Sequence, residues 1–80
     1  DLINSIIKEI KINYDGIIDF NYEKIIKYNS EGVDTLPVFN AIWSKKVSEE
    51  FIENQESKIR KLINLKLTND SFILKREIAL

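Results

Sequence analysis

The residues best suited to chemistry in this chain are acidic and amide side chains gathered in two short polar segments. The first segment holds Asn13, Asp15 and Asp19, and the second holds Asp70 and Glu77. Oxygen ligands of this kind suit calcium or magnesium, and paired carboxylates can also act as general acid and base. No nucleophile, basic clamp or glycine-rich phosphate loop accompanies them. We therefore expect weak metal binding at most, and no catalysis.

The composition of the chain excludes several classes of function. The chain has no histidine and no cysteine, which excludes disulfides, thiol nucleophiles and the commonest zinc ligands. Twelve Lys and Arg against thirteen Asp and Glu give a net charge of -1, so nothing favours nucleic acid as a partner. No apolar run approaches the roughly 20 residues of a membrane span. Because no signal-like apolar segment is present, we expect an intracellular, cytoplasmic protein.

The spacing of apolar residues predicts helices. Ile3, Ile6, Ile7 and Ile10 lie on one face of a helix that starts near Asp1. Similar spacing predicts further helices over about residues 21–29 and 37–47, and a long one over residues 49–65. A chain of 80 residues suits one domain. We expect residues 1–80 to form a single small domain and, without an initiator Met, to be a fragment of a larger protein.

The two polar segments resemble the calcium loops of EF-hands, which carry oxygen ligands at positions 1, 3, 5, 7, 9 and 12 and Gly at position 6. The alignment places Gly16 at position 6 of the first loop and Ile73 at position 8 of the second. Five residues then fall on ligand positions: Asn13, Asp15, Asp19, Asp70 and Glu77. The resemblance implies a helix-loop-helix protein of the calmodulin-like or calcium-dependent kinase type, with an extra helix between the two hands.

Both loops depart from the EF-hand pattern where calcium needs charge. Lys11 and Lys66 occupy the first ligand position, where neither can bind a cation. Because calcium affinity depends on the number of charged ligands, we expect weak or no calcium binding and no other cofactor. The resemblance then implies a protein-interaction or regulatory module, and a true calcium sensor lobe is the alternative.

A different fold is also compatible with the first polar segment. Asp15-Gly16 flanked by alternating apolar residues is a typical hairpin signal. A hairpin near Gly16 would make the chain a small α+β domain. In that case we expect a non-catalytic structural subunit or scaffold domain of a multiprotein assembly.

Three aromatic residues are the candidate partner-binding side chains: Phe39, Trp43 and Phe51. Tryptophan is enriched at binding hot spots, but such a stripe more often belongs to a core. We commit to a mainly helical, all-α domain that binds a protein partner, either a helix or a neighbouring domain, on its apolar face.

Overall fold

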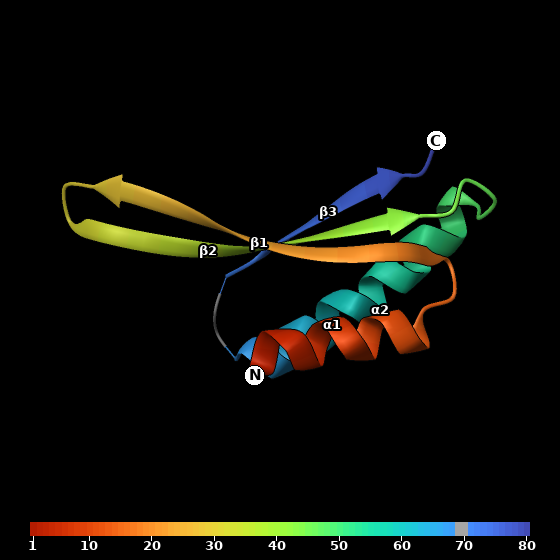
Figure 1. Ribbon diagram of the computed structural model, residues 1–80, viewed down its shortest axis with the longest axis horizontal. Helices are drawn as coiled ribbons and strands as arrows, with labels where there is room; N and C mark the ends of the chain where they lie inside the picture. The colour runs from red at the N-terminus through yellow and green to blue at the C-terminus, as the bar shows by residue number, and fades with distance from the viewer. Residues whose placement is uncertain (69–70) are drawn as a thin grey trace.

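The computed structural model describes residues 1–68 and 71–80, which form two helices and three strands (Figure 1). Their order is α1 (Leu2–Asn13), β1 (Ile17–Asn29), β2 (Gly32–Trp43), α2 (Glu49–Leu67) and β3 (Ile73–Ile78). The all-α prediction is therefore wrong, and the α+β alternative agrees with the structure. The hairpin of that alternative turns at residues 30–31, between β1 and β2, and not at Gly16.

The three strands form one sheet in the order β1-β2-β3. β1 pairs with β2 antiparallel, with a bulge between Ile17 and Asp19, and β2 pairs with β3 in parallel. Both helices lie on the same side of the sheet, and the far end of the β1–β2 hairpin extends beyond them (Figure 1). The fold thus has a helix-facing side of the sheet and an open outer side.

Both helices begin at a residue whose side chain caps the first turn. Asp1 Oδ1 accepts a hydrogen bond from the Asn4 backbone N–H at 2.8 Å, and Ser48 Oγ accepts one from the Phe51 N–H at 3.0 Å. Such caps satisfy backbone donors that have no partner within the helix. The predictions of a first helix and of a long helix from Glu49 are confirmed, and the latter continues to Leu67.

The helices predicted over residues 21–29 and 37–47 are wrong, because both segments lie mainly in strands. β1 and β2 are rich in the aromatic and β-branched residues that favour strands. Pro37 has no N–H to donate, but the pairing of β2 with β3 starts one residue later, at Val38. The proline therefore interrupts no pairing with β3. Because a strand follows Gly16 in place of an exiting helix, the EF-hand resemblance is also wrong.

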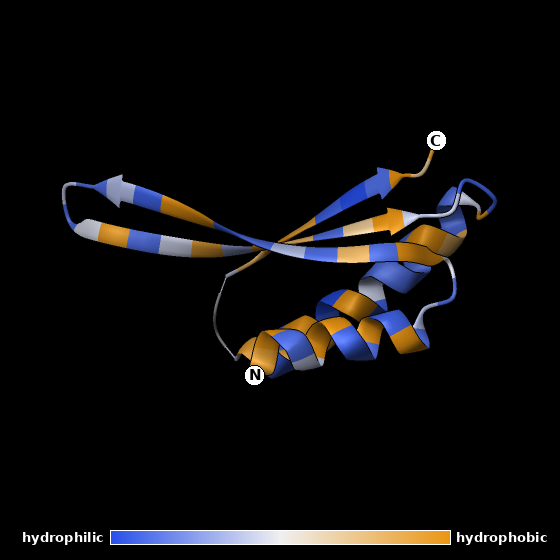
Figure 2. Cartoon of the chain, in the orientation of Figure 1, coloured by the Kyte–Doolittle hydropathy of each residue, from blue (hydrophilic) through white to orange (hydrophobic). Residues whose placement is uncertain are grey.

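The core lies between the sheet and the two helices. Phe39 is fully buried, and its ring lies 5.7 Å from that of Phe20, 5.3 Å from that of Tyr22 and 6.1 Å from that of Phe72, centroid to centroid. The remaining buried side chains of the core cluster come from α1, β2, α2 and β3: Ile6, Ile10, Ala41, Trp43, Ile52, Ile59, Ile63, Leu67 and Leu74. Figure 2 shows that apolar residues recur between polar ones along both helices and along the strands.

A charged residue ties β3 to α2. Arg76 donates two hydrogen bonds to the Glu56 carboxylate, from Nε at 3.0 Å and from Nη2 at 2.6 Å, and its Nη1 lies 3.7 Å from Glu49 Oε1. The hydrogen bond to Glu56 is the largest contribution that raises the pKa of Arg76. An arginine–carboxylate pair with two hydrogen bonds fixes the relative position of the two side chains better than a single surface ion pair does.

We expect Arg76→Met to lower the free energy of unfolding by about 1–2 kcal/mol, because a charged hydrogen-bonded pair is lost. Arg60→Met is the matched control, since Arg60 is exposed on α2. Chemical denaturation of both variants checks the expectation. Equal stabilities of the two would mean that the Arg76 contacts contribute nothing to holding β3.

Candidate functional site

The β1–β2 hairpin continues past the helices as a two-stranded extension, which we call the arm (residues 24–36). Every residue of the arm except Leu36 is exposed. Its strands run in register from Lys24 opposite Pro37 to Asn29 opposite Gly32. Figure 1 shows no helix and no third strand of the described residues over it. A two-stranded ribbon is marginally stable by itself, so this part of the chain is built without the packing that supports the rest.

Large apolar side chains lie on both sides of the arm. Ile26 is 50% exposed, Tyr28 78% and Val33 64%, and alternation from Phe20 and Tyr22 places the first two on the helix-facing side. Ile25 is 37% exposed and lies on the outer side. Exposed apolar residues that cluster on one structural feature mark an interaction surface more often than scattered ones do.

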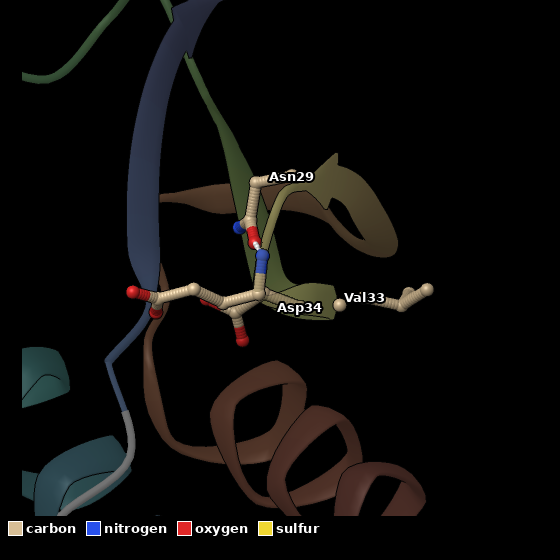
Figure 3. A pocket seen from close by; sticks show the side chains of 5 residues that line it. Asn29, Val33 and Asp34 are labelled. Atoms are coloured by element: carbon tan, nitrogen blue, oxygen red, sulfur yellow. Dashed lines mark hydrogen bonds between the residues drawn. The ribbon is translucent and has the colours of Figure 1, made fainter.

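The tip of the arm is a tight turn with a shallow hollow (Figure 3). Asn29 Oδ1 accepts a hydrogen bond from the Glu31 N–H at 2.9 Å, and Gly32 has a φ of 129° that side-chain-bearing residues rarely adopt. The hollow has a volume of about 190 Å³ and is lined by Asn29, Glu31, Gly32, Val33 and Asp34. Two carboxylates, those of Glu31 and Asp34, border it.

β1 is an edge strand of the sheet. It pairs with β2 along one side, and along its other side there is no strand among the described residues. At its beginning, Lys11 from α1 reaches Asp19 with a distance of 3.3 Å between Nζ and Oδ1. Beyond that ion pair, residues 21–29 present their outward backbone groups to solvent on a long strand without proline. An exposed edge of this kind is a template for another strand.

The outer side of the sheet carries a polar surface beside this edge. Lys75 Nζ on β3 lies 4.0 Å from Glu23 Oε1 on β1, so the ion pair crosses β2. Between these strands Val38 is fully buried. A hollow of about 170 Å³ is lined by Asn21, Tyr22, Glu23 and Asn40. Polar groups that can accept and donate hydrogen bonds therefore stand next to the open edge.

The structure does not gather the predicted metal ligands into one site. Asn13 ends α1 and donates from Nδ2 to the Glu9 carbonyl oxygen, and Asp15 lies in the turn that follows. Asp19 is paired with Lys11, as described above, and Glu77 lies on β3, with Ile42 between them in register. Asp70 lies outside the described residues. In the described part of the chain, no three acidic side chains come together as a metal site.

Two of the three predicted partner-binding residues lie inside the protein. Phe39 and Trp43 have no exposed surface, whereas Phe51 on α2 is 37% exposed. The side chains of Phe39 and Trp43 thus belong to the hydrophobic core beneath the sheet. The arm residues Ile26, Tyr28 and Val33 were not predicted as a surface. The alternation of Asp19-Phe20-Asn21-Tyr22-Glu23 is the sequence signal that could have identified their strand.

Tyr14 connects α1 to β1 and packs against the core. Burial, and secondarily the negative charge of Glu9, raise the pKa of its phenol above the ordinary value of 10.0. The unfolded chain therefore loses this proton at lower pH than the folded chain does, and stability falls as the pH rises above about 10. We expect Tyr14→Phe to flatten this alkaline loss, measured by thermal unfolding between about pH 8 and pH 11. Parallel curves for both proteins would contradict the assignment.

Neither helix of the described residues is both long and apolar enough to cross a membrane. No curated protein matches the chain. Among solved structures, the chain is similar to the C-terminal domain of MamB, a magnetosome protein of Desulfamplus magnetovallimortis BW-1. The two share 11% sequence identity with a TM-score of 0.63, over 99% of this chain and 91% of that one. At this identity the likeness concerns the fold.

A family model covers nearly the whole chain. It matches residues 2–77, from the start of α1 to β3, and is described as a domain of unknown function. The match includes the arm, both helices, β1, β2 and all of β3 except Ile78. The chain belongs to this family, DUF8492.

Proposed function

We propose that the chain is a non-catalytic protein-interaction module, a structural or scaffold domain that binds a protein partner through the arm and the adjoining edge of β1. The observation that carries the proposal is the arm itself. Its side chains Ile26, Tyr28 and Val33 remain exposed on a ribbon that the rest of the domain does not support. A partner that covers them would bury apolar surface and stabilise the ribbon.

The free edge of β1 supplies the second part of the interaction. A strand from a partner can add to residues 21–29 by main-chain hydrogen bonds, and the alternating side chains can then select the partner. The outer hollow beside Glu23 and Asn40 adds polar groups for that selection. The fold is shared with the C-terminal domain of MamB, a magnetosome protein.

Photocrosslinking in the cells that naturally make the protein tests this function. Tyr28→p-benzoylphenylalanine places the reactive group on the arm, and Lys61→p-benzoylphenylalanine places it on an exposed position of α2 as a control. We expect one adduct of defined mass from position 28, identified by mass spectrometry, and none of that mass from position 61. No adduct at position 28, or the same adducts at both positions, would refute a binding role for the arm.

A further inference from the structure

The edge of β1 carries a charge pattern that complements itself. Glu23, Ile25 and Lys27 are two residues apart, so all three side chains lie on the outer side of the sheet. Consider a second copy of this strand, related to the first by a two-fold axis that is perpendicular to the sheet and passes at Ile25. Lys27 of the second copy then lies opposite Glu23 of the first, and Glu23 of the second lies opposite Lys27 of the first. Directly opposed, oppositely charged side chains stabilise antiparallel pairs.

Neighbouring axes produce poorer pairing. An axis through Glu23 opposes two carboxylates at its centre and sets Lys27 opposite Asp19, whose carboxylate already pairs with Lys11. An axis through Lys24 opposes two ammonium groups, and directly opposed like charges destabilise a pair. An axis through Ile26 opposes Lys27 to Ile25 and forms no ion pair. The axis through Ile25 is therefore the one that charge favours. It aligns residues 21–29 of two copies over their full length, starting just after the Lys11–Asp19 ion pair.

The same register also suits the helix-facing side. It places Tyr28 of one copy opposite Tyr22 of the other, and Ile26 opposite Lys24. Tyr22 already packs against the core cluster, so the exposed Tyr28 of the second copy would lie beside a partly buried aromatic ring. The arm of each copy would then extend the sheet of the other at its β1 edge, next to α1. Exposed apolar area on both arms would be removed from water.

The hollow on the outer side fits this arrangement. It is lined by Asn21, Tyr22, Glu23 and Asn40. In the Ile25 register, Asn29 and Lys27 of the second copy stand opposite Asn21 and Glu23. The second copy thus brings a hydrogen-bonding amide and an ammonium group to polar side chains that border open space.

We propose that the partner of the β1 edge is a second copy of this chain, paired antiparallel about Ile25 so that two three-stranded sheets become one six-stranded sheet. The inference rests on the proposed interaction role and names its partner. A closed two-fold pair uses the same surface on both copies and leaves neither β1 edge open to further strands.

Sedimentation equilibrium of the purified chain, from about 1 µM to about 1 mM, tests the proposal. We expect a reversible dimer. Glu23→Lys alone and Lys27→Glu alone each oppose like charges twice and should weaken the dimer at least about tenfold. The double variant restores both ion pairs and should return the dissociation constant to within about threefold of the original. Circular dichroism of each variant confirms that the monomer is folded.

The outcomes separate this inference from the proposed function. A monomer at every concentration, or single and double variants that associate like the original chain, would overturn the second-copy assignment. If position 28 also crosslinks to a different protein, the interaction role stands with another partner. If position 28 crosslinks to nothing and the chain is monomeric, both proposals fail.

Discussion

Replacing Phe39 with alanine should cost about 3–5 kcal/mol of folding free energy, the range for deleting a fully buried aromatic side chain. Phe39 has no exposed surface and contacts three other rings, so its removal leaves a cavity between the sheet and helices. A domain of this size is stable by roughly 4–12 kcal/mol. We therefore expect the melting temperature to fall by roughly 15–30 °C, or the cooperative transition to disappear.

Tyr28→Ala is the control for that experiment, because Tyr28 is 78% exposed at the end of the arm. Its removal from a dilute, monomeric sample should change stability by no more than about 0.5 kcal/mol. Thermal and urea unfolding followed by circular dichroism measure both variants. Similar losses for Phe39→Ala and Tyr28→Ala would contradict the placement of the core between sheet and helices.

The largest expected effect on association comes from Ile26→Thr. Ile26 is half exposed in the single chain, and in the two-fold pair Lys24 of the other copy covers part of its surface, once in each copy. Losing about 1 kcal/mol of burial at each position weakens the dimer about tenfold to a hundredfold. Threonine keeps the β-branched shape that suits a strand, so the monomer should melt at the same temperature as the original chain.

Leu65→Gln provides the comparison for Ile26→Thr. Leu65 is 76% exposed on α2, so this change also removes an exposed apolar side chain and leaves the arm and the β1 edge intact. Sedimentation equilibrium should show an unchanged dissociation constant. If Leu65→Gln weakens the dimer as much as Ile26→Thr does, the contact involves the helices, and the edge-to-edge arrangement is wrong.

The helices could be predicted from the sequence because their signals are local. Ile6 and Ile10 repeat at helical spacing, and Asp1 and Ser48 are residue types that cap helix starts. Each of these signals lies within a few residues of the structure that it predicts. The long helix from Glu49 was therefore predicted to within two residues of its end at Leu67.

The strands were misread because their alternation is interrupted. The bulge between Ile17 and Asp19 and the doublet Ile25-Ile26 break the period of two that a regular strand shows. Asn29 to Gly32 resembles a helix end, since both a hairpin turn and a helix stop use Asn and Gly. Pro37 resembles a helix start, and its tolerance in β2 depends on where β3 begins, 36 positions later at Ile73.

The candidate site was even less accessible to sequence reasoning. Charged and turn-forming residues near Gly16 suggested a calcium loop, although Lys11 in fact pairs with Asp19 across the helix–strand junction. The exposure of Ile26 and Tyr28 depends on the placement of α1 and α2, the helices of the described residues, away from the arm, which is a property of the whole fold. A strand edge becomes visible only when the order of the strands is known.

A disulfide across the symmetry axis tests the central claim most directly. The chain contains no cysteine, so Ile25→Cys introduces one thiol per copy. Opposed residues of antiparallel strands have Cα atoms about 4.5–5.5 Å apart, within the span that a disulfide tolerates. Mild oxidation should convert the I25C variant to a covalent dimer, seen on a non-reducing gel, while Leu65→Cys remains mostly monomeric. Equal yields from the two variants, or no dimer from I25C, would contradict pairing of β1 edges about Ile25.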